Sequence, residues 1–476
     1  MRARRMARSM CGVRARLVLA RRTGVGVLML AGVTTVAMAQ RAQSPTATTP
    51  APLVFDKVTV VDVEHGKLLP DQRVVVVGTR IQAMGRASNI KLPPAAHVVD
   101  ARGKYLIPGL WDMHAHTDRA PGIYTLLVAN GVTGIREMTS EWPEDFDLIR
   151  RQRGEIARGA LLGPRIVATS HDFVGPMCGG SFPVAAADTS ILREAAALLA
   201  ANCSDSGAVR TPEEIRRFVD TLKAGGVDFV KAHTISDPKV YFAFLAEARR
   251  VGIPAVGHLG GAFGRAVTEI EASDSGLRSI EHLPEMGCWQ KNWDSWVNGE
   301  ASLPDSLMER QCAAVAKRLR HNGTWIVPTM YVLYHSNMLN MQLDFEAPIR
   351  ALGALHRFGA PILAGSDAII DPGQEKQPLE SALHEELALL VKAGLTPVEA
   401  LRAATLNPAK FFGSTDSLGT VASGKLADLV LLDADPLADI ANTRKIGAVV
   451  ANGRYFDRAA LDKLVAEAHA NLLGAP

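Results

Sequence analysis

Short apolar runs recur through the middle of the chain, and segments with helical patterning separate them. Strand-like runs that alternate with helices are typical of parallel βα units. Eight such strands predict an α/β fold of the closed (β/α)8 TIM-barrel type. The predicted strands are Ile107–Met113, Gly134–Met138, Arg165–Thr169, Phe229–Ala232, Pro254–Val256, Ser279–Ile280, Trp325–Pro328 and Ile362–Ala364.

Capping signals mark the ends of three predicted helices. Thr211-Pro-Glu-Glu214 combines an N-cap, a proline at the first helical position and a capping-box glutamate, and Gly225-Gly226 ends that helix. Thr396-Pro-Val-Glu399 repeats the pattern. Asp237-Pro238 opens a helix that we expect to end at Gly252.

The two ends of the chain share a different pattern, in which short β-branched runs alternate with glycine and proline turns. Runs such as Val74-Val75-Val76-Val77 occupy residues 53–101, and similar runs return at Leu429–Leu432 and Val449-Val450. This pattern is typical of strands. We expect a small composite β-sandwich from residues 53–105 and 415–456, with the barrel, residues 106–414, inserted between its halves. Residues 457–476 are expected to form a C-terminal helix or tail.

Composition indicates an ordinary globular protein of 476 residues, of which 47% are hydrophobic and 21% charged. Residues 1–39 contain eight arginines and no lysine, aspartate or glutamate, so the formal charge of +3 becomes −5 without them. A mildly acidic protein gives no reason to expect nucleic acid as a partner. We expect a small-molecule substrate, and a homo-oligomer is compatible with the sequence.

The N-terminal stretch has the pattern of a secretory signal peptide. A basic region ends at Arg21-Arg22, an apolar run spans Val25–Val36, and Ala37-Met38-Ala39 offers a cleavage site. The apolar run is too short for a spanning helix, and the alternative is an uncleaved membrane anchor. We expect residues 1–39 to be a signal peptide, residues 40–52 a flexible leader, and the mature protein to be periplasmic or secreted.

The cysteine count agrees with export. The cysteines that remain after the signal peptide are Cys178, Cys203, Cys288 and Cys312. An even number in an oxidising compartment predicts two disulfides, and four cysteines allow three pairings. We expect sequence neighbours to pair, 178 with 203 and 288 with 312.

Candidate chemistry begins at His114 and His116, which close the first predicted barrel strand. Residues i and i+2 of a strand point to the same side, so both imidazoles can reach one ion. Further polar residues end later strands, whose carboxyl ends meet at one rim of a barrel. Each alone has a structural alternative, such as a surface lysine or a helix-capping aspartate. Together they predict a metal site made of His114, His116, Lys231, His258, His282 and Asp367.

Lys231 needs a separate explanation, because a protonated amine repels divalent cations. Reaction with carbon dioxide converts a lysine into an anionic carbamate with two oxygens. A carboxylated Lys231 can bridge two divalent metal ions, which makes the expected site binuclear. Zinc is the expected metal for a histidine-rich site, and manganese, cobalt and iron accept the same ligands.

The motifs that carry a family resemblance are Leu106-Ile-Pro-Gly-Leu-Trp-Asp-Met-His-Ala-His116, Ser279-Ile-Glu-His282, Leu363-Ala-Gly-Ser-Asp367 and Gly419-Thr-Val-Ala-Ser-Gly-Lys-Leu-Ala-Asp-Leu-Val430. Over about residues 53–456 the chain resembles the metal-dependent amidohydrolase superfamily. A lysine at position 231 that is followed by single histidines is similar to the pattern of its prolidase-like branch. Deaminase-type members lack the lysine and use one metal. The resemblance implies that His114, His116 and Asp367 hold the more buried metal, that His258 and His282 hold the second, and that Lys231 bridges them.

The resemblance also implies hydrolysis of an amide or peptide bond in a small dipeptide or N-acyl amino acid substrate. Two metal ions would lower the pKa of a bridging water and polarise the scissile carbonyl. Asp367 would take the proton and deliver it to the leaving amine. The alternatives are hydrolysis of a lactone, carbamate or phosphotriester, and a non-catalytic binding protein. Two departures leave the substrate subclass open: Leu259-Gly260-Gly261 follows His258 without a second histidine, and Arg136-Glu137 replaces a more usual Arg-Asp pair.

Other polar and aromatic residues near strand ends have both a functional and a structural interpretation. Those that could contact substrate or serve the structure are His171, His233, Tyr331 and His335. Arg136 could bind a substrate carboxylate or pair with an acid at the rim. A tryptophan group could form an aromatic lid or one face of a helix packed on the core, and we prefer the second: Trp289, Trp293 and Trp296.

Overall fold

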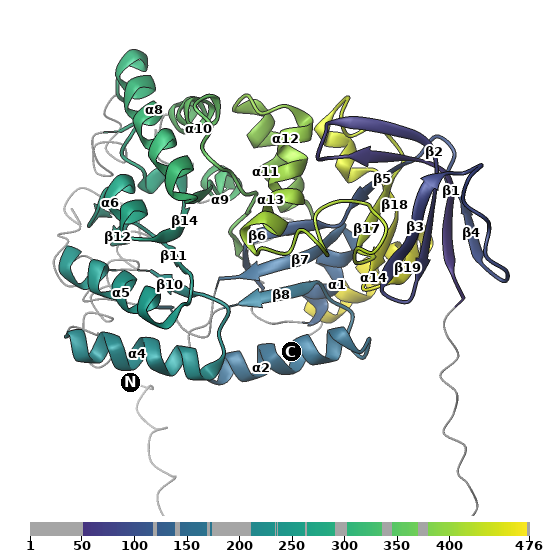
Figure 1. Ribbon diagram of the computed structural model, residues 1–476, viewed down its shortest axis with the longest axis horizontal. Helices are drawn as coiled ribbons and strands as arrows, with labels where there is room; N and C mark the ends of the chain where they lie inside the picture. Colours follow the sequence, from purple (N-terminus) through teal and green to yellow (C-terminus); the bar gives the residue numbers. More distant parts are fainter. Residues whose placement is uncertain are drawn as a thin grey trace, which may run out of the picture. The chain divides into compact units, whose positions relative to one another are not determined.

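A computed structural model gives the arrangement of most of the chain (Figure 1). The described residues are 51–117, 121–138, 143–168, 172–173, 211–233, 235, 237–261, 264–290, 302–335, 345–369 and 379–473. Outside them lie the predicted signal peptide, most of the leader, the pairing of Cys178 with Cys203, and His171, Trp293 and Trp296. Within the described ranges, no helix has the length and hydropathy that crossing a bilayer requires.

Strands from the middle of the chain form two parallel sheets (Figure 1). The four-stranded sheet contains, in spatial order, β16 (Ala368–Ile369), β6 (Leu110–His116), β7 (Val132–Glu137) and β8 (Arg165–Ala168). The five-stranded sheet contains β15 (Trp325–Val327), β14 (Leu277–Glu281), β11 (Ala255–Gly257), β10 (Val230–Ala232) and β9 (Asp172–Phe173). All neighbours in both sheets run parallel. Helical crossovers join parallel strands in this way, so the α/β prediction is confirmed.

The predicted eighth barrel strand, Ile362–Ala364, is wrong as a strand. It makes a single isolated parallel bridge, between Ile362 and Ile326. Pro361 precedes the segment and has no N–H to donate to a neighbouring strand. Gly365 follows it and has no side chain to pack in a sheet. The last parallel strand is instead β16, which begins directly after Asp367.

Backbone hydrogen bonds join the two sheets at both margins. At one margin, Leu363 N donates to Ile326 O at 2.9 Å, and Met113 N donates to Ala364 O at 2.9 Å. At the other, Asp228 N donates to the carbonyl of Ala168, the last residue of β8, at 3.1 Å. Among the described residues, the parallel strands from the middle of the chain form two sheets rather than one closed ring.

Helices follow most of these strands, and three of them begin at the predicted caps. Thr211 forms the capping box of α4, Asp237 caps α5, and Thr396 forms the capping box of α12. Gly226 and Gly252 end the first two with φ values of 76° and 71°, which glycine adopts readily. The helices are α1 (Pro121–Ala129), α2 (Pro143–Ala157), α4 (Pro212–Gly225), α5 (Pro238–Val251), α6 (Glu269–Asp274), α8 (Asp305–Asn322), α9 (Met330–His335), α10 (Glu346–Arg357), α11 (Leu379–Lys392), α12 (Pro397–Ala403), α13 (Leu406–Phe411) and α14 (Arg458–Leu473). The predicted C-terminal helix is therefore present as α14.

Strands from both ends of the chain form one eight-stranded sheet (Figure 1). It contains, in order, β19 (Arg454–Asp457), β18 (Ile446–Ala451), β17 (Leu429–Leu432), β5 (Tyr105–Pro108), β1 (Leu53–Asp62), β2 (Lys67–Val77) and β3 (Arg80–Arg86), and β4 (His97–Asp100) pairs with β1. In β17, Leu429 and Leu431 belong to the cluster inside this sheet, whereas Val430 and Leu432 belong to the main core. Successive side chains of a strand point to opposite faces, so β17 contributes side chains to two hydrophobic cores. The predicted union of the two ends is present as a single sheet, and its division into sandwich layers stays a prediction.

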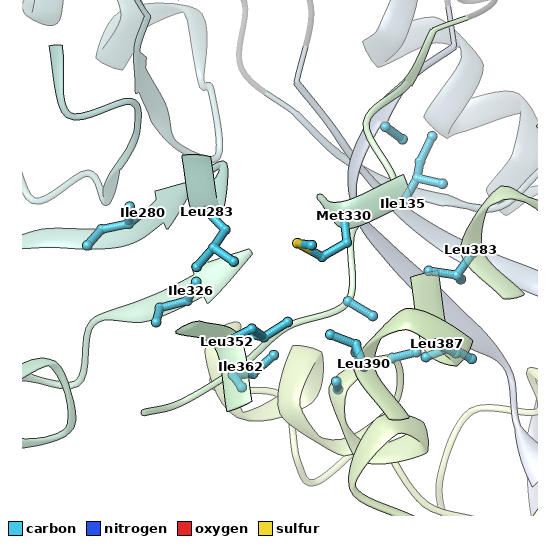
Figure 2. Packing of buried hydrophobic residues seen from close by; sticks show 14 of the residues in the cluster. Ile135, Ile280, Leu283, Ile326, Met330, Leu352, Ile362, Leu383, Leu387 and Leu390 are labelled. Atoms are coloured by element: carbon cyan, nitrogen blue, oxygen red, sulfur yellow. The ribbon is translucent and has the colours of Figure 1, made fainter. Parts of the chain in front are cut away.

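The main hydrophobic core combines side chains from both parallel sheets with side chains of the surrounding helices (Figure 2). Ile135 comes from β7, Ile326 from β15, Leu352 from α10 and Leu390 from α11, and all are buried. Burial of one such side chain contributes about 1.5–3 kcal/mol, so this shared core stabilises both sheets together. Nearby, Cys288 and Cys312 form the predicted disulfide, with Cα atoms 4.9 Å apart.

Gly365 lies where the chain crosses β6, and no side chain fits there. A Cβ at this position would lie 2.7 Å from His114 N and 2.5 Å from Val327 Cγ1. We predict that Gly365→Ala lowers the free energy of unfolding by about 1–3 kcal/mol, measured by urea denaturation. Gly225→Ala is the matched control, because a Cβ there meets no atom within 4 Å. Wild-type stability of Gly365→Ala would contradict the close approach.

Candidate metal centre

Each residue of the predicted metal site lies within or beside a parallel strand. His114 and His116 end β6, His258 directly follows β11, and His282 directly follows β14. Asp367 immediately precedes β16, and its N–H donates to His114 O at 2.8 Å, which holds it beside β6. The backbone is unusual at two of these residues, since φ is 65° at His282 and 53° at Asp367. Residues other than glycine pay an energetic cost in this region, and such positions cluster at functional sites.

His114, His116 and Asp367 form a compact cluster. Asp367 Oδ1 lies 2.9 Å from His116 Nε2 and 3.5 Å from His114 Nε2. One ligand atom from each residue lies within 4.8 Å of the others. His114 is fully buried, and among the described residues its Nε2 has no hydrogen-bond partner, which is costly for a polar atom. A cation would satisfy this nitrogen, and two imidazoles with a carboxylate are a donor set that suits divalent transition metals.

His258 and His282 form a second pair beside this cluster. Their Nε2 atoms are 3.2 Å apart, and the ring centroid of His282 is 4.8 Å from that of His114. His282 Nδ1 lies 2.9 Å from Thr329 Oγ1 and 3.6 Å from Asp367 Oδ2. Asp367 therefore faces histidines of both pairs with its two carboxylate oxygens.

Lys231 lies in the same buried region, in the middle of β10. Its side chain is 1% exposed, and Nζ donates to Met138 O at 3.0 Å. Burial is the main cause that lowers the pKa of both His114 and His282, and the positive charge of Lys231 adds to it. β10 pairs with β11, the strand that His258 directly follows. The structure therefore brings the four histidines and Asp367 together and puts Lys231 on a neighbouring buried strand, and the role of these six residues as metal ligands stays a prediction.

Burial also sets the protonation of the site. It lowers the pKa of His114 well below its ordinary value and that of His282 to about 4, so both rings are neutral at pH 7. Neutral imidazole is the form that binds metals. Burial alone would raise the pKa of Asp367, but the hydrogen bond with His116 and the charges of His282 and His116 bring it below its ordinary value. Asp367 is therefore an ionised carboxylate beside the neutral rings of His114 and His282.

Two carboxylates, one of the buried Glu281 and one of the half-buried Glu285, contact histidines of the site from outside, and neither was among the predicted site residues. Glu281 Oε2 is 2.9 Å from His114 Nδ1, and Glu285 Oε1 contacts His258 Nδ1. The direction of the Glu281 side chain could have been predicted from the sequence, because side chains alternate along β14 and put Glu281 on the same face as Ser279. Glu285 lies in the short 3-10 turn Leu283–Glu285, where no periodic pattern reveals its direction.

Arg136 is fully buried and has no access to a substrate. Its Nη2 donates to both carboxylate oxygens of Glu281 at 2.8 Å, its Nη1 donates to Ser279 Oγ at 2.9 Å, and its Nε donates to Met113 O at 2.6 Å. Of the two predicted roles, carboxylate binding is therefore wrong. Pairing with an acid is present, although the acid lies in the interior rather than at the rim.

Of the remaining candidates, one lies beside a histidine of the site and the others make packing contacts. His233 lies beside His258, with ring centroids 4.7 Å apart. Tyr331 is buried and stacks on His335, with centroids 4.5 Å apart. Trp289 is buried in the main core, as the core interpretation predicts, but it lies outside the described helices, so the shared helix face stays a prediction.

A protein family matches the chain over most of its length. Residues 105–455 match the Amidohydrolase family. The chain belongs to the amidohydrolase family. The match covers both parallel sheets together with β17 and β18, so the resemblance inferred from the motifs is confirmed.

Curated relatives of this amidohydrolase include adenine deaminases. The adenine deaminase of Rubrobacter xylanophilus is 26% identical over 432 residues, which cover 85% of this chain and 58% of the relative. Adenine deaminase 2 of Agrobacterium fabrum is 27% identical over 388 residues, which cover 79% of this chain and 52% of the relative. The chain therefore spans just over half the length of these relatives.

Solved structures similar to this amidohydrolase include several hydrolases. A molinate hydrolase has a TM-score of 0.65 at 20% identity, with 87% of this chain and 96% of that chain covered. A putative prolidase from Bifidobacterium longum has a TM-score of 0.63 at 24% identity, with 89% and 100% covered. A Xaa-Pro dipeptidase has a TM-score of 0.63 at 19% identity, with 86% and 100% covered. At these identities the likeness establishes a shared fold.

The buried pair of Arg136 and Glu281 gives a stability prediction. Arg136→Met leaves the Glu281 carboxylate unpaired in the interior and should lower the free energy of unfolding by about 3–5 kcal/mol, measured by urea denaturation. The double variant Arg136→Met/Glu281→Leu should recover much of this loss, because both charges are then absent. A double variant no more stable than Arg136→Met would rule out the unpaired charge as the cause.

Proposed function

We propose that this amidohydrolase binds two divalent metal ions and hydrolyses amide or peptide bonds in small substrates such as dipeptides or N-acyl amino acids. The observation that carries the proposal is the convergence of four imidazoles and one ionised carboxylate in one site, with Lys231 buried on the neighbouring strand β10. His114, His116 and Asp367 would hold the more buried ion. His258 and His282 would hold the second, with zinc as the expected metal.

Lys231 would join the two ions as a carbamate. Its neutral amine attacks carbon dioxide, an N–C bond forms, and a proton leaves, so the amine becomes an anion with two oxygens. The burial of Lys231 on β10, beside the strand that His258 follows, supports this role. An anionic oxygen ligand attracts cations there, whereas an ammonium group would repel them.

The chain itself would supply the proton transfer. Divalent ions held at such a site lower the pKa of a water molecule and polarise the scissile carbonyl, so hydroxide is available near neutral pH. Asp367 is ionised, and its oxygens face His116 and His282. It can therefore accept the proton of the attacking water and donate it to the leaving amine.

We infer in addition that the two parallel sheets are halves of a (β/α)8 barrel. The hydrogen bonds at Leu363 and Met113 on one side, and at Asp228 on the other, support closure. The similarity to solved amidohydrolase-type folds supports it as well. In a closed barrel, the carboxyl ends of all strands surround one mouth, which would explain why the six residues gather.

Two similarities bear on the substrate. The similarity of the lysine and histidine pattern to the prolidase-like branch favours dipeptides or N-acyl amino acids, whereas the curated relatives are adenine deaminases. Hydrolytic deamination of adenine is therefore the second candidate function. Lactones, carbamates and phosphotriesters are further candidates, because activated hydroxide attacks these electrophiles too. Each of these is a small molecule, and we expect no nucleic-acid partner.

We also propose export to a periplasm or beyond, with residues 1–39 removed. The basic and apolar pattern of these residues supports it. The disulfide between Cys288 and Cys312 agrees with an oxidising compartment. N-terminal sequencing of the protein from its native host tests this, and a mature chain that retains residues 1–39 would contradict it.

Metal analysis combined with mass measurement of the folded protein tests the class of site. We predict two equivalents of divalent metal per chain and the added mass of one carbon dioxide, which Lys231→Ala should lose. A screen of dipeptides, N-acyl amino acids, adenine, lactones, carbamates and phosphotriesters then separates the candidate reactions. One metal per chain without added mass would refute the binuclear site, and turnover of adenine alone would select the deaminase.

The proposed proton transfer predicts a specific loss on substitution of Asp367. Asp367→Asn cannot accept a proton, so kcat should fall by about 10²–10⁴-fold on the substrate that the screen identifies. Asp220→Asn is the matched control, because Asp220 is an exposed aspartate paired with Arg250 on the surface. Metal content is measured in the same samples, and full activity of a metal-loaded Asp367→Asn would exclude the proposed role.

A further inference from the structure

The segment that ends β14 carries two glutamates that point to different histidine pairs. Glu281 is the last residue of β14, His282 follows it, and Glu285 ends the 3-10 turn Leu283–Glu285. His282 has a φ of 65°, so the chain turns sharply between the two glutamates. As a result, Glu281 reaches the ring of His114 whereas Glu285 reaches the ring of His258.

Glu281 orients His114 for binding through Nε2. Glu281 Oε2 is 2.9 Å from His114 Nδ1, and both side chains are fully buried. An ionised carboxylate only accepts hydrogen bonds, so Nδ1 carries the proton and the lone pair of Nε2 points toward Asp367 Oδ1, 3.5 Å away. Arg136 donates to both oxygens of Glu281 at 2.8 Å, and this holds the carboxylate in place.

Glu285 reaches the same nitrogen of the other ring, although here the contact is a close ion pair rather than a hydrogen bond. Its Oε1 contacts His258 Nδ1, and its Oε2 accepts a hydrogen bond from Leu259 N at 2.9 Å. The carboxylate therefore spans the ring of His258 and the next amide. His258 O in turn accepts a hydrogen bond from Tyr241 Oη at 2.7 Å. With Nδ1 directed at Glu285, His258 Nε2 points to His282 Nε2 at 3.2 Å.

We propose that Glu281 and Glu285 are separate positioning residues, one for each metal of the proposed binuclear site. Glu281 acts through His114 on the more buried ion, and Glu285 acts through His258 on the second ion. Glu281 fixes the tautomer and direction of the His114 ring, and Glu285 fixes the direction of the His258 ring. One five-residue segment, Glu281–Glu285, therefore sets the two affinities independently while His282 lies between its ends.

Zinc titration of the metal-free full chain against a chelating competitor tests the proposal. Glu281→Gln and Glu285→Gln each replace the carboxyl group by an amide of similar shape. Each variant should weaken one zinc equivalent by about 10–100-fold and leave the other unchanged. The double variant should weaken both. Absorption spectra of the cobalt-loaded chain should change in a different band for each single variant, because the two glutamates act on different ions.

Glu386→Gln is the matched control. Glu386 is as buried as Glu281, but it accepts a hydrogen bond from the backbone of Tyr331 at 2.7 Å, and its hydrogen bonds in the described part of the chain reach no histidine. Both zinc affinities should stay at the wild-type values in this variant. If Glu281→Gln and Glu285→Gln weaken the same equivalent, or match the control, the inference is wrong. Wild-type protein that binds fewer than two metals would instead refute the proposed function, so the two failures are distinguishable.

Discussion

Desolvation of polar side chains at the ends of the parallel strands is the constraint on which the rest of this structure depends. A buried charge is tolerated only when it is paired and hydrogen-bonded. Arg136 on β7 and Glu281 on β14 satisfy each other across the interior, and they belong to different parallel sheets. Asp112 is likewise fixed by His114 N at 3.0 Å and Ser366 Oγ at 2.6 Å. The network that orients the histidines is therefore also the polar connection between the two sheets.

The gathering of the four histidines and Asp367 could be predicted because each lies at or beside the boundary of an apolar run, whereas their role as metal ligands stays a prediction. Strand alternation joins His114 to His116, and the common direction of parallel strands joins these to the later residues. The outer carboxylates could not be predicted in this way. Glu281 meets its partner His114 across 167 positions, and Glu285 meets Leu259 across 26. Such contacts depend on which strands adjoin and on the turn after β14, and no local pattern encodes either.

The fold shows the same division between local and distant determinants. Helix caps at Thr211, Asp237 and Thr396 were correct, because a cap is satisfied by atoms within a few residues. Ile362–Ala364 was wrong as a strand, because its bonding depends on what borders it: β15 on one side and β6 on the other. The predicted binding of a substrate carboxylate by Arg136 was wrong for the same reason, since the sequence around Arg136 does not reveal which acid lies opposite it in the fold.

The sheet built from both chain ends has a consequence for biosynthesis. β5 is an interior strand that lies between β1 and β17, and its pairing with β17 runs from Pro108 opposite Leu429 to Tyr105 opposite Leu432. A nascent chain that has not reached Leu432 exposes an apolar strand edge, which is a template for aggregation. Val430 and Leu432 would be missing from the main core of the same unfinished chain. The fold can therefore be completed only after β17 has been translated, and a chain truncated before Leu432 cannot complete its hydrophobic core.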